Sequence, residues 1–178
     1  MPQLAEAEAR RRFTAARVAR LATVDSAGHP HQVPVVFADC PSEGAEGPLG
    51  GAADRIVTAV DHKPKTTTRL RRLRNVAAHP AVCLLADAYD EDWDHLWWVR
   101  ADGEASVLPP DAADPAVRQA HARAVGLLCA KYPQYGDDPP TGPVIAVTVR
   151  RWSGWQARAE PSGRRTPCTP VVPETHEE

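Results

Sequence analysis

Short segments with the composition of β-strands, most of them separated only by turn-forming residues, follow one another through this 178-residue chain. Alternating apolar and β-branched residues predict strands in about seven places: 18–25, 31–38, 55–60, 81–86, 95–100, 104–108 and 144–152. Helical composition is limited to three segments: 4–16, 66–76 and 111–131. Strands linked mainly by hairpins predict a mainly β, α+β fold, an antiparallel barrel with helical excursions, rather than a regular strand-helix alternation.

Turn and breaker residues indicate where the predicted elements end. Residues 26–30 (SAGHP) are turn formers between the first two predicted strands, and Asp102-Gly103 is a strong hairpin signal between segments 95–100 and 104–108. Residues 39–54 are rich in glycine and show no periodicity, which predicts a loop. The composition becomes proline-rich and polar near the C-terminus. We therefore expect one barrel domain over 1–158 and a disordered tail over 159–178.

The balance of charge excludes several classes of partner. The 21 basic and 23 acidic residues give a net charge of -2, so no overall basic field attracts nucleic acid or anionic lipid. The longest apolar run is 81–86, far shorter than the ~20 residues of a membrane span, and the N-terminus lacks the apolar region of a secretory signal. We therefore expect a cytoplasmic protein that binds neither nucleic acid nor membranes. The cysteines and histidines show no metal-ligand spacing, so no metal site is expected.

The first candidate site is a pair of lysines, Lys63 and Lys65, in a chain whose other basic residues are nearly all arginine. They are followed by three threonines, beginning with Thr66, where the helix 66–76 is predicted to start. Free N–H groups and the dipole at a helix N-terminus favour an anion, and lysine and threonine side chains add donors for a phosphate. The alternative is a threonine N-cap with solvated lysines.

Two further patterns have mainly structural interpretations. Trp97 and Trp98 are neighbours on a predicted strand, so they point to opposite faces. We expect one in the core and the other against a ligand or, more readily, a partner subunit. The arginines of the helix 66–76 are interpreted as a solvated face rather than a nucleic-acid footprint; they are Arg69, Arg71, Arg72 and Arg74.

Several segments carry a resemblance to a known family. Residues 19–24 (ARLATV) and 28–35 (GHPHQVPV) resemble the first hairpin of the pyridoxamine-5'-phosphate-oxidase-like split β-barrels. Residues 61–66 (DHKPKT) with 70–73 (LRRL) are similar to the phosphate-binding segment of the branch that uses the deazaflavin coenzyme F420, the flavin/deazaflavin oxidoreductases of type B. Three later segments also resemble a subgroup of that branch: 89–93, 96–100 and 131–135. The resemblance covers about residues 5–157.

This resemblance implies a homodimer of split β-barrels in which each cofactor lies in a groove between the two subunits. It implies that the phosphate of F420 meets Lys63, Lys65 and Thr66. It also implies that the tricyclic ring lies against the predicted strands 31–38 and 55–60. The residues expected near the ring are His31, Val33, Pro34 and Thr58. The candidates for the anionic tail of the coenzyme are Arg55, Arg69 and Arg72.

The implied activity is that of a reductase that transfers a hydride from the deazaflavin C5 to a small organic acceptor. In this chemistry the protein supplies binding, orientation and exclusion of water, so no catalytic side chain is required. His31 and His62 are candidate proton donors, and water is a third. FMN in place of F420 is an alternative on the same fold, because a fold does not determine a function. The other alternative is a non-catalytic protein that binds or carries F420.

Overall fold

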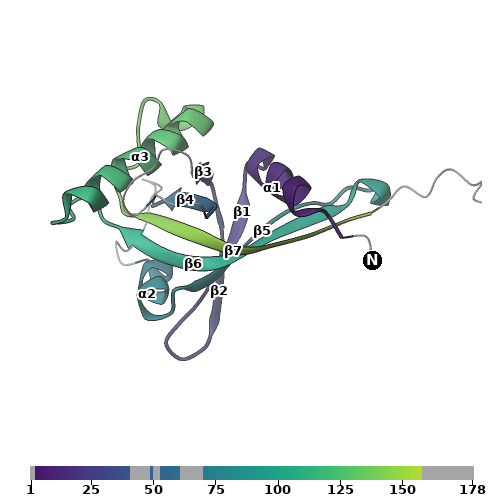
Figure 1. Ribbon diagram of the computed structural model, residues 1–178, viewed down its shortest axis with the longest axis horizontal. Helices are drawn as coiled ribbons and strands as arrows, with labels where there is room; N and C mark the ends of the chain where they lie inside the picture. Colours follow the sequence, from purple (N-terminus) through teal and green to yellow (C-terminus); the bar gives the residue numbers. More distant parts are fainter. Residues whose placement is uncertain (1–2, 41–48, 50–52, 61–69, 158–178) are drawn as a thin grey trace, which may run out of the picture.

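The described part of the chain forms one antiparallel sheet (Figure 1). The computed structural model describes residues 3–40, 49, 53–60 and 70–157. The strands are β1 (Ala19–Val24), β2 (Pro30–Val35), β3 (Ala38–Cys40), β4 (Arg55–Ala59), β5 (Ala81–Ala88), β6 (Trp97–Leu108) and β7 (Val144–Gln156). Their order in the sheet is β2-β1-β5-β6-β7-β4-β3. The helices are α1 (Glu6–Ala15), α2 (Arg71–Ala78) and α3 (Pro115–Lys131). This architecture confirms the expected α+β class and is consistent with a split barrel.

The β1–β2 hairpin is built by residues of its own turn. The Asp25 carboxylate accepts hydrogen bonds from two backbone N–H groups of the turn, at 2.9 and 3.0 Å. Gly28 has a φ of 86°, a conformation that glycine adopts without steric cost. The resulting register places His31 opposite Thr23. The turn predicted at residues 26–30 is therefore confirmed.

The hairpin predicted at Asp102-Gly103 is wrong. The two segments expected on either side of it form a single strand, β6, which pairs with β7 from Trp97 to Leu108. The register with β7 shifts between Asp102 and Gly103, so the dipeptide lies at a bulge. A Cβ on Gly103 would lie 2.4 Å from the carbonyl oxygen of Thr148 on β7. Glycine is required here by the close approach of two strands and not by a turn.

Two buried clusters lie on opposite faces of the sheet. On the first, here called the α1 face, Phe13 of α1 packs against Phe37 and Trp152, with ring centroids 4.7 and 5.2 Å away, and Val76 of α2 joins the same cluster. On the second, here called the α3 face, α3 covers β3 and β4, where Val57 is buried. Figure 1 shows α3 at one end of the sheet and α1 beside the long arm formed by β5, β6 and β7.

The C-terminal end of α3 is fixed by residues of the segment 131–135. The Tyr132 hydroxyl accepts a hydrogen bond from the Phe37 N–H at 3.1 Å. It lies 2.8 Å from the Phe37 carbonyl oxygen and 2.9 Å from that of Arg17, to one of which it donates. Lys131 Nζ donates to the Thr14 carbonyl oxygen at 2.9 Å and lies 3.9 Å from the centroid of the Phe37 ring. These contacts join α3 to the chain before β1 and after β2. Lys131 and Tyr132 of the segment 131–135 therefore have a structural role.

Trp97 and Trp98 point to opposite faces of β6, as predicted. Trp97 packs against the cluster on the α1 face. Trp98 lies on the α3 face, where it is partly exposed and pairs across the sheet with Asp87 and Trp155. The buried cluster under α3 includes Leu108, at the other end of β6 from Trp98.

Several sequence predictions fall outside the described residues. They concern the tail 159–178 and residues 41–48 and 50–52 of the predicted loop 39–54. Asp39 and Cys40, at the predicted start of this loop, belong to strand β3 instead, because they pair with Ile56 and Arg55 of β4. No helix in the described ranges is long and apolar enough to cross a membrane.

Candidate functional site

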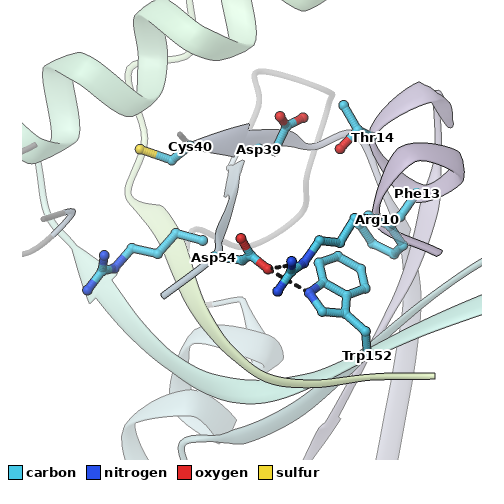
Figure 2. Close-up of a pocket in the computed structure, with 8 residues that line it drawn as sticks. Arg10, Phe13, Thr14, Asp39, Cys40, Asp54 and Trp152 are labelled. Atoms are coloured by element: carbon cyan, nitrogen blue, oxygen red, sulfur yellow. Dashed lines mark hydrogen bonds and ion pairs between the residues drawn. The ribbon is translucent and has the colours of Figure 1, made fainter. Parts of the chain in front are cut away.

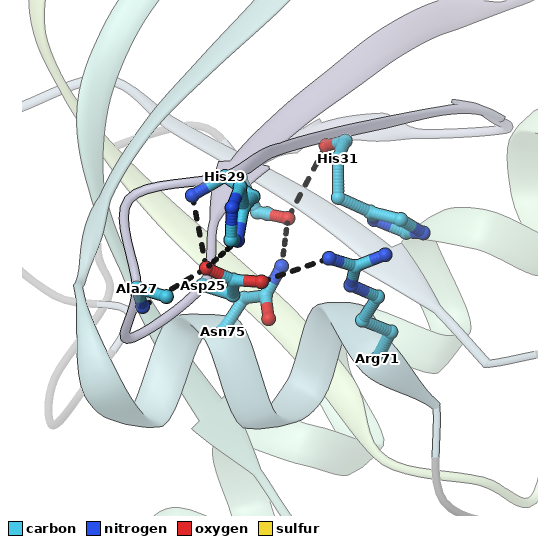
Figure 3. Close-up of polar contacts among 7 residues, drawn as sticks. Asp25, Ala27, His29, His31, Arg71 and Asn75 are labelled. Atoms are coloured by element: carbon cyan, nitrogen blue, oxygen red, sulfur yellow. Dashed lines mark hydrogen bonds and ion pairs between the residues drawn. The ribbon is translucent and has the colours of Figure 1, made fainter.

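The N-terminal end of α2 docks on the β1–β2 hairpin through two side-chain contacts (Figure 3). Asn75, which is 2% exposed, donates from Nδ2 to Thr23 Oγ1 at 2.9 Å. Arg71, the first residue of α2, donates from Nη2 to Asp25 Oδ2 at 2.8 Å. Arg71 and Asn75 are one turn apart, so both lie on the helix face that meets the hairpin. These two contacts fix the start of α2 relative to β1 and β2.

Asp25 accepts hydrogen bonds from three donors. Its Oδ1 accepts from the backbone N–H groups of His29 and Ala27, and its Oδ2 accepts from Arg71. The hydrogen bond from the His29 backbone and that from the Arg71 guanidinium hold the pKa of Asp25 well below its ordinary value. Asp25 is therefore ionised at neutral pH and holds the guanidinium of Arg71 against the hairpin.

His31 lies beside this ion pair, on β2 (Figure 3). Its backbone carbonyl accepts from Thr23 Oγ1 at 3.3 Å. The ring nitrogen Nδ1 is buried and has no hydrogen-bond partner within the described ranges. Burial, followed by the charges of Arg71 and Arg72, lowers the pKa of His31 from its ordinary value. At neutral pH His31 is therefore a neutral imidazole next to two guanidinium groups.

This arrangement, here called the α2 anion site, is suited to bind an oxyanion. The guanidinium groups of Arg71 and Arg72 lie near His31 at the N-terminal end of α2. The Asp25 carboxylate offsets the charge of Arg71, which leaves Arg72 and the helix end as the sources of positive potential. Nδ1 of a neutral His31 can donate or accept a hydrogen bond, according to the tautomer. A buried polar atom without a partner is costly, so a ligand that bonds His31 Nδ1 would stabilise the site. A phosphate group has the charge and the acceptor oxygens that these side chains require.

Four residues predicted for the site lie outside the described residues. They are His62, Lys63, Lys65 and Thr66. They belong to the segment 61–69, which leads from β4 to α2 in the sequence. Their predicted roles therefore stay predictions, and the described part of the site is the α2 anion site that follows them in the chain.

The remaining predicted residues divide between the two faces of the sheet. On β2, His31 and Val33 point to the α1 face, where Val33 packs against the buried cluster, whereas Pro34 is exposed on the other side. On β4, Thr58 is 3% exposed and points to the α1 face. Arg55 points to the opposite face, because side chains alternate along a strand. The structure thus brings His31, Val33 and Thr58 to one face and separates Pro34 and Arg55 from them.

The contacts that position α2 were not predicted from the sequence. Arg71 was expected on a solvated helix face, and no role was expected for Thr23, Asp25 or Asn75. A signal was present for Asp25, since aspartate just before a glycine-containing turn commonly bonds the turn's N–H groups. The hydrogen bond between Asp25 and Arg71 gave no such signal, because it joins residues that are far apart in the sequence.

Comparisons with known proteins identify the fold. A family model described as Pyridoxamine 5'-phosphate oxidase matches residues 5–156. An FAD-binding protein from Mesorhizobium loti superposes with a TM-score of 0.60 at 18% identity, over 86% of this chain and 95% of that one. A conserved hypothetical protein from Mycobacterium tuberculosis gives 0.61 at 20%, over 87% and 86%. An FAD-binding protein from Mycobacterium smegmatis gives 0.52 at 16%, over 89% and 100%. No curated protein sequence matches the chain.

At 16–20% identity the solved structures show only a shared fold. The family model shows membership of the family, because it matches residues 5–156, nearly the whole described region. The expected relationship to pyridoxamine-5'-phosphate-oxidase-like barrels is therefore confirmed, and assignment to the F420-dependent branch stays a prediction. The chain belongs to the pyridoxamine 5'-phosphate oxidase family.

Proposed function

We propose that this protein is a coenzyme F420-dependent oxidoreductase, a reductase that transfers a hydride from the deazaflavin C5 to a small organic acceptor. The α2 anion site carries the proposal. There, Arg71 and Arg72 adjoin a neutral His31 whose Nδ1 has no partner among the described residues. In the sequence, Lys63, Lys65 and Thr66 precede this site, and they would bind the cofactor phosphate together with it.

Family membership supports a cofactor with a flavin-like ring. Two structural neighbours are described as FAD-binding proteins. FMN and F420 both carry a phosphate, so the α2 anion site suits either cofactor. The sequence resemblance of residues 61–66 and 70–73 favours F420, while an FMN-binding oxidoreductase is the second candidate. A non-catalytic F420-binding or carrier protein is the third.

The protein's own residues would bind, orient and shield the cofactor. When bound in its reduced form, F420 supplies a hydride at C5. Val33, partly exposed on the α1 face of β2, would pack against the ring and exclude water, whereas Thr58 on the same face of β4 is 3% exposed and would support this surface from within. His31 at the α2 anion site would hold a proton at Nδ1 or accept one from a ligand, and His62 or water are the other candidate proton donors.

We further propose that the partner is a second copy of the chain, with each cofactor between two barrels. The α3 face presents Trp98 and Trp155 side by side, both partly exposed. Tryptophan is enriched at protein interfaces, where its large apolar surface is removed from water. Sedimentation velocity of the wild type and of Trp98→Ala tests this: a dimer that the substitution weakens supports the proposal, and a wild-type monomer contradicts it.

A binding titration tests the cofactor assignment. The purified protein is titrated separately with F420, FMN and FAD, and quenching of tryptophan fluorescence is followed. The proposal expects micromolar binding of F420 and at least tenfold weaker binding of FMN and FAD. Tighter binding of FMN would favour the second candidate, and binding of none of the three would overturn the proposal. A panel of quinones, enones and nitroaromatics is then offered to the protein with bound reduced F420. If none of these acceptors reoxidises the bound F420, the third candidate, a non-catalytic F420-binding or carrier protein, is favoured.

A further inference from the structure

The loop between β5 and β6 carries two large aromatic side chains that face water. Tyr89 is 77% exposed and Trp93 is 76% exposed. Among the described residues, the one other exposed large apolar side chain is that of Val18. Single exposed apolar side chains are ordinary, but two aromatic rings in one short loop favour a surface that another segment covers. Residues 89–95 are here called the β5–β6 tip, which lies at the end of the long arm, away from α2 and α3 (Figure 1).

The β5–β6 tip is also strongly acidic. Four of its residues carry exposed carboxylates: Asp90, Glu91, Asp92 and Asp94. Asp90 and Asp92 accept hydrogen bonds from backbone N–H groups of the tip itself, at 3.0 and 3.1 Å. Within the described ranges, the ion pairs of these four carboxylates are limited to one between Asp92 and Nδ1 of His95, at 3.7 Å. The tip therefore presents aromatic rings and negative charge without an arginine or lysine partner among the described residues.

Elsewhere in this protein an arginine completes the same combination of groups. Where α1 meets β7, Arg10 Nε and the indole N–H of Trp152 converge on Asp54, at 2.6 and 2.8 Å (Figure 2). Arg12 pairs with a glutamate of its own helix at 2.6 Å and lies 5.7 Å from the ring centroid of Trp97. A guanidinium group can bond a carboxylate in its plane and stack on an aromatic ring by its face. The chemistry of the β5–β6 tip therefore favours arginine as its partner.

The last described strand delivers the chain to this tip. β7 pairs with β6 as far as Gln156, which lies opposite Trp97, and the N–H of Ala157 donates to the carbonyl oxygen of Leu96 at 2.8 Å. Trp93 is three residues before Leu96, so the Cα atoms of these two residues are at most about 11 Å apart. The residues that follow Ala157 therefore start beside the β5–β6 tip.

The next residues in the sequence are rich in arginine. The segment 158–165 (RAEPSGRR) has three arginines and one glutamate, so its charge is opposite to that of the β5–β6 tip. Residues 160–163 (EPSG) have the residue types of a type I turn, with proline second and glycine fourth. The seven residues from Ala157 to Arg164 can span up to ~23 Å, which is enough to return to Trp93. Because the segment is tethered beside the tip, its binding is intramolecular and weak contacts suffice.

We propose that the segment 158–165 of this chain binds the β5–β6 tip. Its guanidinium groups bond the carboxylates of the tip and lie against the ring of Trp93, which removes part of the exposed indole from water. The segment includes only the first residues of the tail 159–178, so the predicted disorder then concerns the residues after 165. The tip lies far from α2, and its binding to the segment does not rest on the proposed function (Figure 1).

The indole N–H of Trp93 reports on this contact. In ¹H–¹⁵N spectra of the full chain at neutral pH and low salt, its resonance is assigned by its loss in Trp93→Phe. The tail variant Arg164→Gln/Arg165→Gln should shift this resonance, and about 0.5 M NaCl should shift it in the same direction in the wild type, because salt screens the charges. The control variant Arg74→Gln/Arg150→Gln removes two exposed arginines of α2 and β7 and should leave it unchanged. Equal positions in the wild type and the tail variant would overturn the proposal.

Backbone dynamics measure the same contact from the side of the segment. In the wild type, heteronuclear NOE values should be higher for 158–165 than for 170–178, because a bound segment moves less on the ps–ns timescale. This difference should be lost in the tail variant and in Glu91→Gln/Asp94→Asn, which leaves the two carboxylates that bond the tip's own N–H groups in place. Equal NOE values for both segments in the wild type would overturn the proposal. A difference that appears only at high protein concentration would assign the contact to a second copy, and would also overturn it.

Discussion

Tyr132→Phe tests whether the segment 131–135 acts on stability and not on cofactor binding. Tyr132 is 1% exposed, and its hydroxyl bonds the N–H of Phe37, which is 0% exposed, and one of two nearby carbonyl oxygens. Removal of the hydroxyl leaves a buried donor and a buried acceptor without this partner. At about 1–3 kcal/mol for each of the two unsatisfied groups, we expect the free energy of unfolding to fall by about 2–6 kcal/mol. The ring contacts are retained, so the loss comes from the hydroxyl alone.

Urea denaturation of the wild type and Tyr132→Phe measures this loss, and it should lower the midpoint with an unchanged slope. The matched control is Tyr89→Phe, because Tyr89 is 77% exposed and the same change there should stay within about 0.5 kcal/mol. Affinity for F420 should be the same in all three proteins. If Tyr132→Phe lowers the free energy of unfolding by less than about 0.5 kcal/mol, or if it alone weakens F420 binding, the structural role assigned to the segment 131–135 is refuted.

Three further outcomes are expected. Lys65→Ala should weaken F420 binding by about 1.5–3 kcal/mol if Lys65 bonds the phosphate, and an unchanged Kd would remove Lys65 from the site. The pKa of Asp25 is lowered in the folded protein. Its ionised form therefore stabilises the fold at pH values above 3.8, the ordinary pKa of an aspartate, and this contribution is lost as the pH falls below that value. The difference in unfolding free energy between wild type and Asp25→Asn should therefore be full at pH 6 and shrink below pH 4; a difference that stays constant over this range would contradict the assignment. Gly103→Ala should destabilise the fold by about 1–3 kcal/mol, because the added Cβ would clash with the Thr148 carbonyl oxygen. Thermal unfolding measures this loss, and an unchanged melting temperature would argue against the close approach of β7 at the bulge.

The parts of the fold that could be predicted are those determined by neighbouring residues. The β1–β2 hairpin follows from Asp25 and Gly28, which act within their own turn. Asp102-Gly103 shows the limit of such reasoning. The same dipeptide suits a turn or a bulge, and here β7 decides, because Thr148 passes so close that only glycine fits. That strand lies far along the sequence, and no local pattern reveals its approach.

The candidate site could be predicted only in part. Lys63 and Lys65 stand out in the sequence by their residue type, and their role stays a prediction. The helix after them was expected to begin at Thr66, whereas α2 begins at Arg71, because the backbone of Leu70 is extended. The contact between Asp25 and Arg71 does not stand out in the sequence, because it joins a hairpin turn to a helix start that only the folded chain brings together. Pro34 was expected near the ring from the family resemblance, and Arg55 was a candidate for the anionic tail. Alternation along each strand places both on the opposite face from His31 and Thr58, and their roles stay predictions.

We propose that the start of α2 binds the anionic part of the cofactor, and a comparison of three affinities tests this proposal. The Kd for F420 is compared between the wild type, Arg71→Gln and Arg74→Gln by tryptophan quenching. Arg71 is held at the site by Asp25, whereas Arg74 is an exposed arginine of the same helix and serves as the matched control. We expect a Kd at least tenfold higher for Arg71→Gln and a change below twofold for Arg74→Gln. Equal affinities in all three proteins would contradict it.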